Sequence, residues 1–149
     1  MKVKNPYIKI ASFKGEEHNP LLAPRGVYLK NNTLLVSDTG QNRVFIWKHF
    51  LFQEYQPADV VLGQTEATHT ERNAGDNISA STLQYPSGIW TDGEKLIVAD
   101  AWNHRVLIWH TMPIQHGQPA DVVIGQKDFS ANQPNVDGLS KPCSAQSLY

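Results

Sequence analysis

Residues 34–47, LLVSDTGQNRVFIW, and residues 96–109, LIVADAWNHRVLIW, decide the fold, because they are two copies of one pattern. The copies lie 62 residues apart, and across the wider spans 24–64 and 86–126 the residues are identical at 18 of 41 positions. Such self-similarity at a fixed spacing indicates a duplicated structural unit. The flanking segments repeat at the same spacing: PRGV at 24–27 becomes PSGI at 86–89, and QPADVVLGQ at 56–64 becomes QPADVVIGQ at 118–126.

Each copy is predicted to form four short strands. In the first copy these cover residues 26–29, 33–37, 43–47 and 59–62, which are rich in β-branched, aliphatic and aromatic residues between turn residues. The Asn31-Asn32 pair is a hairpin signal between the first two strands. No ten-residue stretch has a helical period, so we expect little helix. Four antiparallel strands per repeat, arranged radially, are typical of a β-propeller blade, and the predicted class is all-β.

The repeat resembles the NHL repeat in its spacing of Pro-x-Gly-Val/Ile, Leu-x-Val-x-Asp and Asn-x-Arg-Val. The second copy, VADAWNHRVL at 98–107, is a near-complete match and holds the pair Asn103-His104, where the first copy has Gln41-Asn42. The fourth strand is similar to that of bacterial NHL proteins with long repeats. This resemblance covers roughly residues 20–130, and it implies a propeller of NHL-type four-stranded antiparallel blades, six in the usual ring.

The chain holds too few repeats for such a ring. We interpret residues 1–149 as a single partial propeller domain. Residues 7–13 resemble a fourth strand with nothing before it. The remaining segments are repeat 1 at about 20–64, repeat 2 at about 82–126, and a lead-in to a missing third repeat at 127–149.

Two hypotheses about completion follow from the missing repeats. In the first, the sequence is a fragment of a longer protein with no independent function. In the second, identical chains associate, and three chains of two blades each complete six blades. Two blades leave apolar flanks exposed, and repeats of this kind need neighbours or caps, so we expect self-association.

Two polar pairs recur at the turn between the second and third strands, Asp38 with Arg43 and Asp100 with Arg105. A charged site at the propeller mouth is one interpretation. Because the pair occurs in both repeats, we favour a structural ion pair that fixes each turn. The planar guanidinium of arginine can hold a carboxylate and backbone carbonyls together.

Three of the four tryptophans are predicted to be core residues. Trp47 and Trp109 occupy the same position in the two repeats, which indicates packing between blades. Trp90 stands where the first repeat has Tyr28, and we expect it in the core as well.

Trp102 is the exception among the tryptophans, because its counterpart is Gly40 and the fold does not require an aromatic ring there. Together with Asn103 and His104 it forms the candidate binding site. An interface with a neighbouring subunit is an equal alternative for Trp102.

No motif for catalysis or metal binding is present, so no catalytic residue, metal ligand or cofactor is predicted. The six histidines lack zinc-site spacing, and Cys143 has no partner base near it in sequence. Gly-x-Ser-x-Gly and phosphate-binding loops are absent. The resemblance keeps one enzymatic alternative open, a metal-dependent lyase or lactonase-like hydrolase with its site at the channel. A symmetric assembly could gather copies of His104 there.

Composition limits the possible partners and location. The net charge is −1, with 40% hydrophobic and 18% charged residues, so the chain is globular and no nucleic-acid partner is expected. One cysteine excludes an internal disulfide. Without a signal peptide or an apolar run, we expect no membrane contact and a cytoplasmic location.

Long polar connections at residues 65–85 and 127–149 are either functional loops or extensions packed on the blade edge. Leu83 is expected to anchor the end of the first of these connections, and residues 50–52 to pack under their blade or form an interface. The preferred function is therefore a non-enzymatic binding or scaffold module that presents loops to a protein or peptide.

Overall fold

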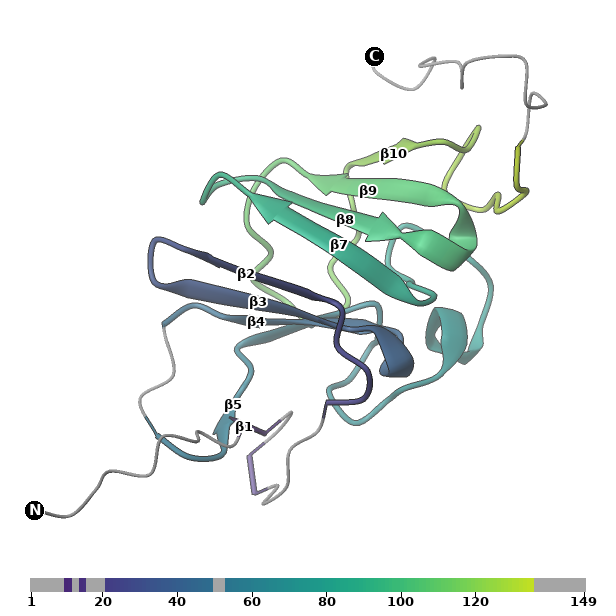
Figure 1. Ribbon diagram of the computed structural model, residues 1–149. Helices are drawn as coiled ribbons and strands as arrows, with labels where there is room; N and C mark the ends of the chain where they lie inside the picture. The colour runs from purple at the N-terminus through teal and green to yellow at the C-terminus, as the bar shows by residue number, and fades with distance from the viewer. Residues whose placement is uncertain (1–9, 12–13, 16–20, 50–52, 136–149) are drawn as a thin grey trace, which may run out of the picture.

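The computed structural model describes residues 10–11, 14–15, 21–49 and 53–135. Within this part of the chain there are two four-stranded antiparallel sheets and one two-stranded parallel pair, and no α-helix (Figure 1). The prediction of an all-β chain with four-stranded antiparallel units is therefore confirmed.

The first sheet has the order β2-β3-β4-β6, so its strands lie side by side in the order in which they occur along the chain. Its first hairpin turns at Asn31 and Asn32, whose φ angles are 47° and 66°, and two positive φ angles in succession are what a tight hairpin turn requires. The strands are β2 (Gly26–Lys30), β3 (Thr33–Asp38), β4 (Arg43–Trp47) and β6 (Val60–Leu62).

The second sheet repeats this topology in the order β7-β8-β9-β10. Between its second and third strands the chain makes one 3₁₀ turn, η3 (Ala101–Asn103), as the first sheet does at η1 (Thr39–Gln41). The strands are β7 (Pro86–Thr91), β8 (Leu96–Asp100), β9 (Arg105–Trp109) and β10 (Val122–Ile124).

The two sheets stack face to face, with β7 lying over β2 and β3 (Figure 1). Each strand places alternate side chains on opposite faces, so one apolar row from each sheet enters the interface. Fully burying a large aliphatic or aromatic side chain contributes about 1.5–3 kcal/mol, which makes this interface the main stabilising element. The buried members are Leu35, Val44, Ile46, Val60, Leu62, Leu83, Leu96, Val98, Leu107, Trp109, Ala120 and Val123.

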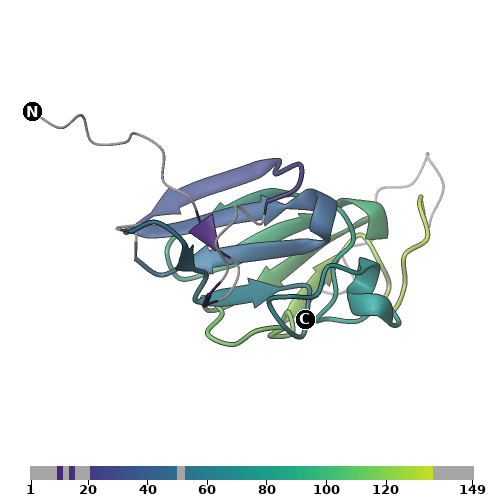
Figure 2. The same ribbon diagram turned by 90° about the horizontal axis from the view of Figure 1, so that it is seen from below.

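The other face of the first sheet is covered as well. Phe45, Trp47 and Val61 pack there with Ile10 of β1 (Ile10–Ala11), which pairs in parallel with β5 (Gln56–Pro57). Figures 1 and 2 show these two short strands beside the first sheet, on the side away from the second. As a result all five residues of β4 are buried, whereas in β9 buried and partly exposed residues alternate.

The structure confirms two predictions about tryptophan and corrects one. Trp47 and Trp109 are buried as predicted, Trp109 between the two sheets and Trp47 on the opposite face of the first sheet, against β1. Trp90 was expected in the core but is 45% exposed, because it points away from the first sheet. The repeat pattern specifies the face on which a side chain stands, and its burial depends on the next layer.

The connection from residue 65 to 85 packs between the repeats and contains a second type of short turn, η2 (Arg72–Gly75). Leu83 is 1% exposed, which confirms the prediction of an apolar anchor at the end of this connection. Of the predicted strand at residues 7–13, the described part is β1, which joins β5 rather than a four-stranded sheet. Cys143, residues 50–52 and residues 136–149 lie outside the described part of the chain.

Candidate binding surface

The turns that follow β3 and β8 are each built on a buried ion pair. Arg43 Nε donates to Asp38 Oδ2 at 2.9 Å, and Arg105 Nε donates to Asp100 Oδ2 at 2.8 Å. All four side chains are almost completely enclosed. Each aspartate is the last residue of one strand and each arginine is the first residue of the next. The ion pair therefore joins the two strands at the base of the turn, where their backbone pairing ends.

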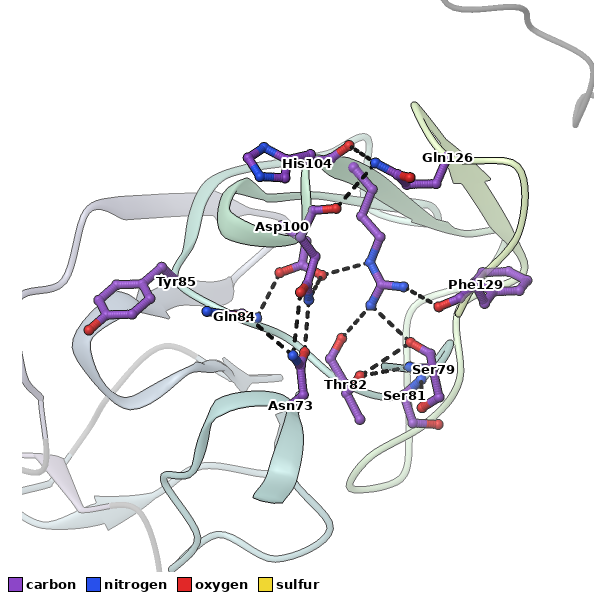
Figure 3. A network of polar contacts seen from close by, with 12 residues as sticks. Asn73, Ser79, Ser81, Thr82, Gln84, Tyr85, Asp100, His104, Gln126 and Phe129 are labelled. Atoms are coloured by element: carbon purple, nitrogen blue, oxygen red, sulfur yellow. Dashed lines mark hydrogen bonds and ion pairs between the residues drawn. The ribbon is translucent and has the colours of Figure 1, made fainter. Parts of the chain in front are cut away.

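Arg105 also fixes the loops around the second turn, and Figure 3 shows how these loops come together at Ser79, Thr82 and Phe129. Its terminal nitrogens donate to the carbonyl of Phe129 at 2.5 Å, of Ser79 at 2.9 Å and of Thr82 at 2.8 Å. Arg43 makes the equivalent bond to the carbonyl of Ala67 at 2.7 Å. A guanidinium is therefore the hub of each repeat, since lysine lacks the fork needed to reach a carboxylate and three carbonyls.

The aspartates accept further hydrogen bonds through their second oxygen. Asp100 Oδ1 accepts the backbone N–H of Gln84 at 2.7 Å, and Asp38 Oδ1 accepts that of Leu22 at 2.6 Å. Burial raises the pKa of both carboxyls above the ordinary aspartate value, and the backbone donors and the neighbouring arginine oppose this rise. The role that this geometry supports is rigid positioning of the turn.

Asn103 is part of this rigid interior. It is fully buried, and its Nδ2 donates to Asp100 Oδ2 at 2.8 Å and to Asn73 Oδ1 at 2.8 Å. Figure 3 labels these two partners, Asp100 and Asn73. Asn103 was predicted to bind together with Trp102 and His104, but its amide is enclosed between two partners, so Trp102 and His104 are the exposed members of the predicted site. Asn73 comes from the long connection and was not anticipated from the sequence.

His104 ends the turn in a left-handed conformation with φ of 53°, and its side chain is exposed. Its counterpart Asn42 has the same conformation, φ 56°, but is buried. Asn42 joins the two repeats, because its amide donates to the Thr70 carbonyl at 3.0 Å and accepts the Tyr85 N–H at 3.0 Å.

Trp102 is 60% exposed and rests on the ring of Tyr85, with 4.9 Å between the ring centroids and 32° between the planes. Offset aromatic pairs at such distances are favourable beyond the area they bury. Figure 3 shows the Tyr85 ring pointing away from the polar network. The pair is thus a partly exposed aromatic surface whose supporting residues are buried and fixed.

Tyr85 was missed in the sequence, although a signal for it exists. Its counterpart is Ala23, and both have a left-handed backbone, with φ of 50° at Ala23 and 49° at Tyr85. A bulky residue in that region is uncommon and costs on the order of 1–3 kcal/mol. The second repeat therefore has aromatic side chains at both positions of the stack, where the first repeat has Ala23 and Gly40.

Metal sites and membrane-spanning helices were looked for among the described residues. No three His, Cys, Asp or Glu side chains in this part of the chain gather closely enough to hold a metal ion. Nor does the same part contain a helix with the length and apolar character to cross a membrane. A scan against models of known protein families gave no match, and a search of curated proteins also gave none.

Proposed function

We propose that this chain is a non-enzymatic binding or scaffold module of the NHL β-propeller type, which contacts a protein or peptide through Trp102 and Tyr85. Two stacked four-stranded antiparallel sheets related by a 62-residue repeat support the propeller part of this proposal. In that arrangement each sheet is one blade, and the turns after β3 and β8 lie at one end of the ring.

The exposed Trp102–Tyr85 stack is the observation that carries the binding proposal. Neither ring is needed for the turn, since the first repeat makes the same turn with Gly40 and Ala23. Tyr85 also has a strained left-handed backbone conformation, and such strain clusters at functional positions. Exposed aromatic side chains on a fixed base are typical anchors of peptide interfaces.

The chemistry of the stack indicates which peptides it favours. Aromatic surfaces bind proline-containing extended segments and, through their negative ring faces, cationic side chains. His104 is an exposed polar group on the same turn as Trp102. A proline-containing or basic peptide therefore suits this surface better than an acidic one, and the net charge of −1 gives no support for a nucleic-acid partner.

Selection from a displayed peptide library tests this proposal. Peptides enriched on the wild-type chain should bind at least about tenfold more weakly to the double variant Trp102→Gly/Tyr85→Ala, which carries the residues of the first repeat. Truncating a central anchor of an interface costs about 2 kcal/mol or more. The matched control is Trp90→Tyr, which replaces another exposed tryptophan with the residue of the first repeat and should leave binding unchanged.

Equal affinity of the selected peptides for the wild type and the double variant would refute the role of the aromatic stack. Failure to enrich any peptide on the wild-type chain over the double variant would refute it too. Circular dichroism of the double variant should match that of the wild type, because the buried ion pair and Asn103 are unchanged.

A further inference from the structure

The second sheet has an apolar face that points away from the first sheet, here called the outer face. It is formed by side chains from all four strands, and each of these side chains is partly or largely exposed. Trp90 is 45% exposed and Ile124 is 36% exposed. Isolated apolar residues are common on protein surfaces, but a continuous apolar sheet face marks an interface. Its members are Trp90, Ile97, Val106, Ile108, Val122 and Ile124.

The chain itself shows what covers a face of this kind. The residues 62 positions earlier form the face of the first sheet that packs against the second sheet, and their side chains are buried there or, for Tyr28, partly buried. Every one of the six positions is apolar or aromatic in both repeats. The counterparts are Tyr28, Leu35, Val44, Ile46, Val60 and Leu62. The face of the second sheet that packs on the first sheet covers these counterparts. A surface of the same kind therefore fits the outer face.

The first sheet carries such a surface on the side away from the second sheet, here called the receiving face. It consists of Val27, Leu34, Val36, Phe45, Trp47 and Val61, the counterparts of Ile89, Leu96, Val98, Leu107, Trp109 and Val123. Part of the receiving face is open, since Val27 is 72% exposed.

A hollow of about 260 Å³ marks the open part of the receiving face, lined by Leu21, Pro24, Arg25, Gly26, Val27 and Val36. The counterparts of two lining residues, Leu83 and Val98, are buried in the interface between the sheets. The hollow thus lies at a position whose equivalent on the second sheet is covered by the first sheet.

We propose that a second copy of this chain docks head to tail, with its receiving face on the outer face of the first copy, in the geometry of the interface between the two sheets. This deepens the proposed function, because it rests on the propeller-type arrangement, but it does not depend on Trp102 or Tyr85. Such an interface is heterologous, so repetition of it closes a ring or continues as a filament. Three copies place six sheets in a closed ring of the predicted kind.

The N-terminal strand β1 competes with this docking. Within the chain, Gly117 of the second repeat donates to the Val61 carbonyl of β6 at 2.9 Å, and His116 Nδ1 accepts the Val61 N–H at 3.0 Å. In the first repeat the corresponding segment includes β5, and it pairs with β1. β1 therefore takes the place that an outer strand from a docked sheet would occupy, and a docking copy has to displace it.

A directed disulfide tests the geometry. A Cβ built on Gly26 lies 3.3 Å from Cγ1 of Ile89, so the two positions touch across the interface between the sheets. The corresponding pair between copies is Gly88 of one copy and Val27 of the other. Within its own chain a Cβ on Gly88 meets only Ala99, at 3.5 Å, so the free chain accommodates cysteine. The Gly26 Cβ lies closer than van der Waals contact to the Ser87 carbonyl oxygen, so in the docked pair the equivalent Arg25 carbonyl has to shift slightly to admit the cysteine. Within one chain the side chains at 27 and 88 point to opposite faces and cannot form a bond of disulfide geometry.

The experiment mixes two single-cysteine chains, Val27→Cys and Gly88→Cys, each with Cys143→Ser, in equal amounts under mild oxidation. Head-to-tail docking is expected to raise the mixed disulfide from the one-half share that random pairing predicts to nearly all of the disulfide-linked product. Adding Trp90→Lys and Ile108→Lys to the Gly88→Cys chain should return the mixed share to one-half, and the exposed Thr111→Lys is the matched control that should not. Weakening β1 with Ile10→Ala in the Val27→Cys chain should increase the rate of mixed-disulfide formation.

A mixed share equal to one-half with the unmodified faces would overturn the proposal, as would a mixed share that Trp90→Lys and Ile108→Lys leave unchanged. An excess of either homodimer would indicate a symmetric interface and would overturn it as well. The disulfide experiment does not measure peptide binding. A negative result would therefore overturn the docking proposal without affecting the proposal that Trp102 and Tyr85 bind a peptide.

Discussion

Replacing Arg105 with methionine should be the most damaging single change at the turns. The guanidinium makes one bond to Asp100 at 2.8 Å and three bonds to backbone carbonyls at 2.5, 2.8 and 2.9 Å, all inside the protein. Methionine fills similar volume but leaves the carboxylate buried without its cation. Breaking a buried ion pair by removing one partner costs about 3–5 kcal/mol, which is a large part of the 5–15 kcal/mol that stabilises an ordinary domain.

Urea unfolding followed by tryptophan fluorescence measures this loss as a lower midpoint at an unchanged slope. Arg105→Lys should lose about half as much, because an ammonium keeps the charge but lacks the fork. The control is Lys95→Met, which removes an exposed pair to Asp92 with 3.5 Å between Nζ and Oδ2 and should cost less than about 1 kcal/mol. A loss of less than about 1 kcal/mol for Arg105→Met would refute the idea that this residue is the hub of the repeat.

Two further predictions concern burial and space. Because burial raises the pKa of Asp38 and Asp100, the folded state binds their protons more tightly than the unfolded state, so their contribution to stability rises as the pH falls from 7 toward about 4. The stability of the wild type relative to Asp38→Asn should therefore increase on acidification, and a decrease in urea titrations at several pH values would show that the pKa is lowered instead. Gly40→Ala should cost about 1–3 kcal/mol, since its Cβ would lie 2.6 Å from the Leu22 carbonyl oxygen. Gly88→Ala, whose Cβ has no contact closer than 3.5 Å, should cost much less when both variants are unfolded with urea.

The sequence was sufficient for the strands, because two independent copies showed the same alternation and the same turn residues. The segments predicted at 26–29, 33–37 and 43–47 are strands in the structure, each ending within one residue of its predicted end. The fourth strand begins at Val60, one residue later than predicted. Asp59 still contacts β4, since its N–H donates to the Ile46 carbonyl at 2.9 Å and its carboxylate accepts the Lys48 N–H at 2.7 Å.

Burial was harder to predict than strand position. Trp47 and Trp90 both stand on sheet faces, but one is covered by β1 and the other is 45% exposed. Asn103 was included in the predicted binding site because it adjoins Trp102, whereas the 3₁₀ turn directs its amide to Asp100 and Asn73. Such outcomes depend on contacts between distant segments, which a local pattern does not contain.

The exchange of Asn42 for His104 connects the two proposed interfaces. Asn42 Oδ1 accepts the Tyr85 N–H at 3.0 Å, and that bond ties one repeat to the next. In a head-to-tail pair of chains, the counterpart of this donor is the N–H of Ala23 in the second copy, and the counterpart of the acceptor is His104. A neutral imidazole has one nitrogen that can accept such a bond. His104 is therefore placed to join two docked copies as Asn42 joins the two repeats. The exposed rings of Trp102 and Tyr85 take no part in this hydrogen bond, so they stay available for a peptide.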